Sequence, residues 1–213
     1  MRTQLHLLIG SFFIFISCNT VLQETHNWIE NSNTDTTEIT EGNYFSLENG
    51  SIKTFLPEGF KQLSLENYKT ILDSALSKTQ LENEMKRLES LRDMQGSFHL
   101  FFDHNTRSTY TLNTLPYINF SKRDATMLLS IVKQKNDQVS LNTGLNFKKL
   151  TAAYAKNKDF TMFRSIFQVD NPKENIRIFS NFYIITADKK TFMINLTTPF
   201  EVNFDRYIEK MKF

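Results

Sequence analysis

The alternation of apolar and polar positions predicts strands over most of the chain from residue 44 onward. "SIKTFLPEGF" (51–60) alternates and then stops at a proline and a glycine, which indicates a strand followed by a turn. Residues 176–187 are apolar on both faces, which is typical of a strand inside a sheet. Further strands are predicted at 97–102, 108–115, 147–155, 160–169 and 191–196.

Apolar residues at helical spacing predict a pair of helices between the first two strand regions. Ser64 precedes the first apolar stripe and serves as its N-cap. Thr79 and Glu82 have the spacing of a capping box, which predicts the start of the second helix. Gly96 is expected to end that helix, because glycine adopts the left-handed conformation found just past helix ends.

Two more helices are predicted farther along the chain. The box of Ser121 and Asp124 begins a helix that is expected to reach Lys135. In the last helix, Thr198 is the predicted cap, followed by a proline at the first helical position and by Glu201. The apolar stripe of this last helix consists of Phe200, Phe204, Tyr207, Ile208 and Met211.

The order of these elements predicts a single α+β domain over 44–213, with one antiparallel β-sheet flanked by helices. Two segments, "IKTFLPEGFKQLS" and "TFMINLTTPFEVNFDRYIEKMKF", resemble the PsbP-like fold of photosystem extrinsic proteins and of many bacterial lipoproteins. The resemblance implies an α/β/α sandwich with the C-terminal helix packed on the sheet. It also implies a role in binding, and it carries over no catalytic residue.

Length, composition and net charge indicate the size of the core and the partners that the domain can bind. The chain has 213 residues, of which 40% are hydrophobic, so it is long enough to bury a substantial core. Lys and Arg number 25 and Asp and Glu 23, which gives a formal net charge of +2. A chain so close to neutral lacks the basic surface that nucleic acid requires, and we expect no nucleic-acid partner.

The first segment has the pattern of an export signal. Arg2 is followed by an apolar stretch over 5–16, which has the length of a signal-peptide core and is short for a membrane-spanning helix. Residues 1–17 are therefore predicted to be a signal peptide. Residues 18–43 are polar and contain no Lys or Arg, which predicts a flexible tether. Trp28 either docks on the domain or lies at a lipid interface.

"FISC" (15–18), which contains the only cysteine of the chain, resembles the lipobox of bacterial lipoproteins. Phe15 departs from the usual Leu or Val of that motif. The resemblance implies cleavage between Ser17 and Cys18, lipid attachment to the Cys18 sulfur and acylation of the new terminus. Several acyl chains, such as palmitate, make a stable membrane anchor. A plain signal peptide or membrane anchor with an incidental cysteine is the alternative.

Candidates for chemistry are few. His99, Asp103 and His104 are weak candidates for a metal site, because imidazole and carboxylate both suit divalent ions. Their spacing argues against it, since residues 99 and 104 leave opposite faces of a strand. No nucleophile elbow, Gly-rich phosphate loop or His-Glu-x-x-His motif occurs, and no cofactor is expected.

Two functions therefore remain. The first is a lipid-anchored binding or scaffold protein of the bacterial cell envelope, whose partner is an envelope protein, a peptide or a glycan. Phe101, Phe163 and Phe167 are candidates to line a groove for such a ligand. The Glu/Lys alternation at 78–93 is either a partner-binding helix face or a solvated one. The second is a hydrolase of envelope glycan or lipid with a pair of catalytic carboxylates.

Overall fold

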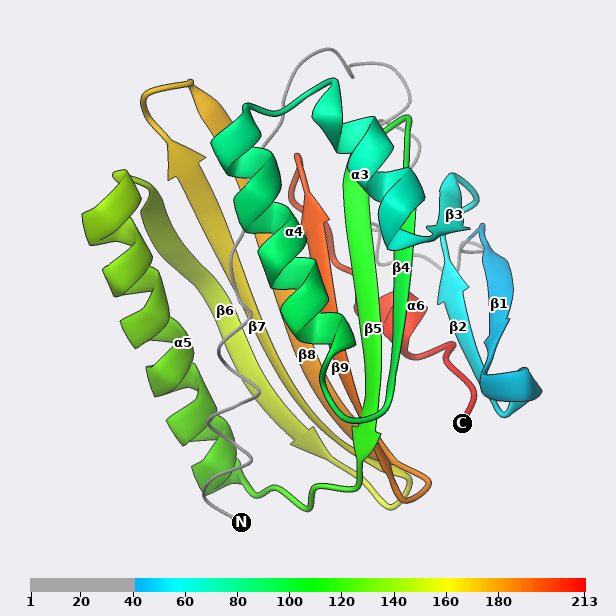
Figure 1. Cartoon of the computed structure of the whole chain (residues 1–213). Helices are drawn as coiled ribbons and strands as arrows, with labels where there is room; N and C mark the ends of the chain where they lie inside the picture. The colour runs from blue at the N-terminus through cyan, green and yellow to red at the C-terminus, as the bar shows by residue number, and fades with distance from the viewer. Residues whose placement is uncertain (1–40) are drawn as a thin grey trace.

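A seven-stranded antiparallel sheet forms the centre of the computed structural model, which describes residues 41–213 (Figure 1). Helices cover the sheet, so the domain is α+β, as its pattern predicts. The strands are, in spatial order, β3 (Phe60–Leu63), β4 (Ser97–Asp103), β5 (Ser108–Pro116), β9 (Lys190–Thr198), β8 (Ile176–Ala187), β7 (Phe160–Asn171) and β6 (Asn146–Lys156). β8 lies inside the sheet, which confirms the expectation from its two apolar faces.

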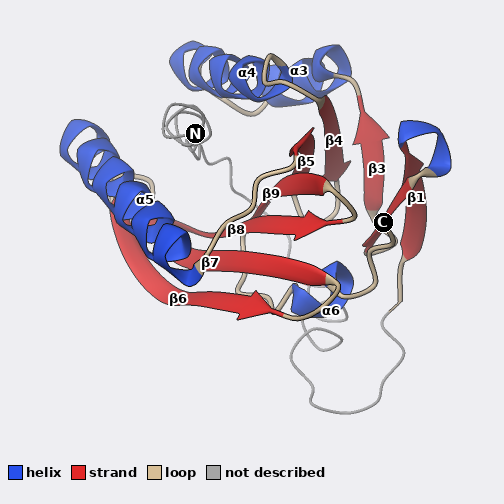
Figure 2. Cartoon of the chain, turned by 90° about the horizontal axis from the view of Figure 1, so that it is seen from below, coloured by secondary structure: helices blue, strands red, loops and turns tan. Residues whose placement is uncertain are grey.

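Three helices cover one face of the sheet: α3 (Leu65–Asp73), α4 (Lys78–Arg92) and α5 (Lys122–Thr143). Figure 2 shows α5 beside β6 and β7, with α3 and α4 over the other half of the sheet. Leu88 and Leu91 of α4 are fully buried in the core that this face forms with Leu100 and Phe182. Their burial supplies roughly 1.5–3 kcal/mol per side chain.

The opposite face is covered by a β-hairpin and a short helix. β1 (Asn43–Leu47) and β2 (Ile52–Leu56) pair with each other, and α6 (Asp205–Ile208) lies beside them. The backbones of Lys53 and Lys212 exchange two hydrogen bonds of 2.9 Å, which fastens the C-terminal residues to the hairpin. The Tyr183 hydroxyl donates a hydrogen bond to Asp205, 3.1 Å away, and thereby holds α6 to the sheet.

Three predicted helix boundaries were wrong, one of them the end of α4, which lies at Arg92 and not at Gly96. α4 begins after Ser77, whose hydroxyl accepts from the backbone of Gln80 while the Gln80 side chain accepts from the backbone of Ser77. This box precedes the predicted one at Thr79 and forms the turn with α3. α5 begins at the predicted box of Ser121 but continues past residue 135, because its buried stripe continues to Val139. Gly144, at φ 79°, then ends the helix.

β5 ends at Pro116, and in the connection that follows it the Ile118 N–H donates to the Thr191 hydroxyl. One predicted helix cap was wrong. Thr198 does not cap a helix. It is the last residue of β9, where it pairs with Phe179, and its hydroxyl donates to the Phe200 carbonyl.

Several predictions lie outside the described residues. These are the signal peptide at 1–17, the lipid anchor at Cys18, Trp28 and most of the tether at 18–43. Over residues 41–213, no helix has both the length and the apolar character needed to span a membrane.

Candidate functional site

The predicted metal candidates do not converge. Asp103 ends β4, and its buried carboxylate accepts hydrogen bonds from the Asn105 N–H at 2.9 Å and the Thr106 hydroxyl at 2.8 Å. His104 is exposed, with its ring edge-on to Phe102. The carboxylate therefore stabilises the β4–β5 turn, a role that short Asx side chains often have.

His99 lies farther down β4, on the side of the sheet that faces the β1–β2 hairpin. Its Nδ1 lies 3.3 Å from the Gln62 amide nitrogen. Burial lowers the pKa of His99, and the nearby Glu48 carboxylate opposes that change. In the described part of the chain, no three His, Cys, Asp or Glu side chains lie close enough together to hold a metal ion.

The three candidate phenylalanines do not form a groove, so that prediction is corrected. Phe101 is fully buried under the hairpin and contacts the rings of Phe45 and Tyr110. Phe163 and Phe167 are each only 2% exposed, and Phe163 belongs to the core on the helical face. Because helices cover one face and the hairpin the other, these aromatic side chains pack inside the domain.

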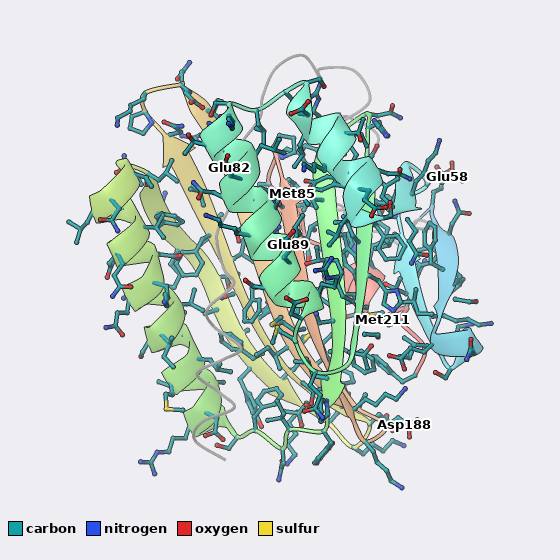
Figure 3. The ribbon with its side chains drawn as sticks, in the orientation of Figure 1. Glu58, Glu82, Met85, Glu89, Asp188 and Met211 are labelled. Atoms are coloured by element: carbon teal, nitrogen blue, oxygen red, sulfur yellow. The ribbon has the colours of Figure 1, made fainter. Side chains whose placement is uncertain are left out.

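A groove of about 610 Å³ runs instead along the outer side of α3 and α4. A volume of this size lies in the usual range for ligand sites, roughly 300–1,000 Å³. Figure 3 shows Glu82, Met85 and Glu89 in a row along the outward side of α4. The groove is lined by Lys69, Asp73, Leu76, Lys78, Leu81, Glu82, Met85, Lys86 and Glu89.

Local sequence fixes the two helices that form the groove. The Ser64 hydroxyl caps α3 by accepting from the Asn67 N–H at 3.1 Å. Four residues after α3, the box of Ser77 and Gln80 starts α4 and turns the chain back over the sheet. Each cap is worth about 1 kcal/mol, so the short connection has a defined shape before any ligand binds.

The groove is apolar at its base and charged at its rim. Leu81 is buried, and Leu76 and Met85 are half-buried between the helices. The rim carries three lysines and three carboxylates. An apolar base with balanced charge around it suits a ligand that is itself amphipathic.

A buried ion pair lies under the groove, on the side of α4 that faces the sheet. Arg87 donates two hydrogen bonds to Glu84, at 2.7 and 2.8 Å, and the two side chains are 10% and 7% exposed. Burial raises the pKa of Tyr68, and Glu84 raises it further. Burial opposes the charge of Arg87, but Glu84 raises the pKa of its guanidinium overall.

Glu84 and Tyr68 line a small cleft of about 40 Å³, together with Arg107 and Thr109. This space admits a water molecule or two, since one water needs about 10–15 Å³ of such volume. The Tyr68 hydroxyl lies 2.9 Å from that of Thr109. Glu84 is the only carboxylate in the lining, whereas glycoside hydrolysis requires two.

Sequence reasoning missed this pair, although a signal was present. Glu84 falls on the same helical stripe as Leu81, Leu88 and Leu91, which are all buried. A carboxylate on an apolar stripe predicts a buried ion pair, and Arg87 is one turn away.

A second charged cluster joins the hairpin to the sheet. Glu48, in the turn between β1 and β2, accepts from the Ser97 hydroxyl at 2.6 Å and from Lys190 at 2.6 Å. Burial alone would raise the pKa of Glu48, but these hydrogen bonds outweigh it and lower the pKa to about 2. Glu48 has a φ of 47°, in the left-handed region. Its two side-chain bonds hold this unfavourable backbone in place.

Comparisons with known proteins give similarity in structure only. No protein-family model matches the sequence, and no curated protein matches it. The cyanobacterial PsbP protein (CyanoP) of Synechocystis sp. PCC 6803, known from a solution structure, is 11% identical with a TM-score of 0.48. That match covers 83% of this chain and 91% of the other. A crystal structure from Bacteroides thetaiotaomicron VPI-5482 is 12% identical with a TM-score of 0.42, over 80% of this chain and 48% of the other.

Proposed function

We propose that this chain is a bacterial envelope lipoprotein, anchored by lipid on Cys18, whose α+β domain binds a polypeptide partner and catalyses no reaction. The groove between α3 and α4 supports the proposal that the domain binds a partner. The lipobox-like residues 15–18 support the anchor.

The chemistry of the groove favours an amphipathic helix as its occupant. A helix can place an apolar stripe between two other helices and direct polar residues to the rim. Met85 is suited to the base, because its unbranched side chain adapts to different apolar anchors. Glu82 and Glu89 are seven residues apart, so the contact extends over about two turns, or about 10 Å. Because the rim carries both signs, the partner helix is expected to carry both signs too.

The hydrolase alternative receives less support from the same residues. Its chemistry needs a carboxylate free to exchange a proton beside a second carboxylate. Glu84 accepts hydrogen bonds from two of the guanidinium nitrogens of Arg87, and the cleft it lines has room for water only.

Site-specific photo-crosslinking tests the groove. A photoreactive residue replaces Glu82 in one variant and Glu58 in the control; both positions are exposed, and Glu58 lies away from α4 (Figure 3). In native membranes, we expect a discrete adduct from position 82, absent from position 58 and lost when Met85→Glu is added. Identical adducts from both positions, or none, would contradict the proposal.

Metabolic labelling with a palmitate analogue tests the anchor separately. We expect label on the wild-type chain and none on the Cys18→Ala variant. Equal labelling of the two, or no label on the wild type, would contradict lipid attachment at Cys18. The proposed binding groove would then be tested by crosslinking alone.

A further inference from the structure

The outer edge of β6 is a second candidate interaction surface, separate from the groove. β6 is the last strand on its side of the sheet, and β7 is its only strand partner among residues 41–213. No backbone hydrogen bond between described residues joins its outer edge to another segment. All 11 residues of β6 are exposed or half-buried. The strand at the other edge, β3, has only 4 residues.

An edge of this length normally carries devices that keep other chains away. β6 has two of them, exposed lysines near its ends and an irregularity in its pairing between Lys149 and Thr151. The strand is regular from Thr151 to Lys156, with an unbroken register against β7. The bulge therefore leaves more than half of the edge available for pairing.

The side chains of β6 form a pattern of basic ends and a small, mostly apolar centre. Lys148 and Lys149 lie near its start and Lys156 at its end, and all three are exposed. The centre reads "LTAAYA" (150–155), and no acidic residue occurs in the strand. Asp170, the nearest acid on β7, already accepts hydrogen bonds from Arg177 at 2.7 Å and Gln168 at 2.6 Å.

This pattern disfavours a second copy of the chain as the occupant. In an antiparallel pair of β6 strands, the start of each strand lies beside the end of the other, which brings Lys149 of one copy near Lys156 of the other. Both side chains lie on the same face of the sheet, because the irregularity between Lys149 and Thr151 shifts the alternation of side chains by one residue. Like charges at neighbouring positions of a sheet are destabilising. Such a pair would repeat the repulsion at both of its ends.

We propose that β6 binds an extended polypeptide segment that adds an eighth strand to the sheet, with acidic residues at both ends and β-branched residues at its centre. Backbone hydrogen bonds along the edge supply affinity in this mode of recognition, and side chains supply selectivity. The lysines at the ends of β6 pair with the acidic ends of the segment. The small alanines in the middle leave room for branched side chains beside them.

Three synthetic peptides about as long as β6 test the proposal on the full chain in detergent micelles. The first has alternating Val and Thr at its centre and Glu at both ends, and the second has Lys in place of Glu. The third is the Glu-ended peptide with alternate backbone nitrogens methylated, which removes its hydrogen-bond donors. Binding is measured by fluorescence polarisation, and its location by hydrogen exchange of residues 146–156.

We expect the Glu-ended peptide to bind about tenfold more tightly than the Lys-ended one and to protect β6 amides, whereas the methylated peptide does not bind. The variant with Lys148, Lys149 and Lys156 all changed to Glu should reverse that preference. The corresponding Gln variant should abolish it. Absence of binding, equal binding of the two charged peptides, binding of the methylated peptide, or protection confined to other elements would overturn the proposal. Concentration-dependent protection of β6 without peptide would do so too, because it would identify a second copy as the occupant.

Discussion

Glu48→Gln is expected to lower the stability of the domain, because the Glu48 carboxylate joins the hairpin to the sheet through its hydrogen bonds. Glu48→Gln keeps the size of the side chain and its contact with Ser97 but removes the charge that Lys190 binds. The fall of the Glu48 pKa from 4.5 to about 2 corresponds to roughly 3 kcal/mol, at about 1.36 kcal/mol per pKa unit. The Glu48 side chain is 23% exposed and Lys190 38%, so solvent screens part of this energy. We expect a loss of about 1–3 kcal/mol in the free energy of unfolding.

The pH dependence follows from the direction of the shift. The folded-state pKa lies below the unfolded one, so the stabilisation is complete above about pH 4.5. It is lost progressively as the pH falls toward about 2, where folded Glu48 also binds a proton. The difference in stability between wild type and Glu48→Gln should therefore be constant from neutral pH to about 5 and shrink below that.

Urea unfolding followed by circular dichroism measures this difference at a series of pH values. Glu58→Gln is the matched control, since Glu58 is exposed and forms no ion pair with any described residue. A loss below about 0.5 kcal/mol at neutral pH would refute the reasoning. So would a difference that stays unchanged down to about pH 3, because the energy would then not come from the charge.

Three further predictions are each checked by equilibrium unfolding. Arg87→Met should cost about 3–5 kcal/mol because it leaves Glu84 buried without its partner, whereas adding Glu84→Leu should recover most of the loss. Asn181→Leu should stabilise by about 1–3 kcal/mol, since its fully buried amide nitrogen and oxygen form no hydrogen bond with described residues; unchanged or lower stability would refute this. Gly96→Ala should cost about 3 kcal/mol or more, because its Cβ would lie 1.7 Å from the Thr114 carbonyl oxygen. Gly50→Ala, in open space at φ 89°, should cost only about 1 kcal/mol.

The outcome at the capping boxes shows what the sequence alone can predict. Ser121 and Asp124 form their box because the connection before α5, in which Ser121 lies, is not part of any strand. Thr198 has the same local pattern, but pairing with Phe179 extends β9 through it and leaves only a short helix from Asp205. The sequence pattern predicts that Gly96 ends a helix, whereas α4 ends at Arg92 and the glycine permits close approach to β5. Local signals predict element types well, but contacts between distant segments decide the boundaries.

The candidate site was only partly predictable for the same reason. The charge alternation of 78–93 indicated an exposed face on α4, and Glu82, Lys86 and Glu89 do line the groove. The groove itself depends on how α3 lies against α4, which follows from the turn at Ser77. The open edge of β6 follows from strand order, because the same sequence in the middle of the sheet would have no free backbone groups.

The pairing of β5 with β9 in the middle of the sheet has a consequence for the order of folding. Strands β6 to β9 are joined in succession, so they can form from neighbouring segments. Pro116 of β5 meets Lys190 of β9 only after α5 and three strands have been placed between them. Contacts that close so long a loop are slow to form. We therefore expect the pairing of β5 with β9 to set the folding rate. Leu112→Ala, in β5, should slow refolding, whereas shortening an apolar side chain of β6 should mainly speed unfolding.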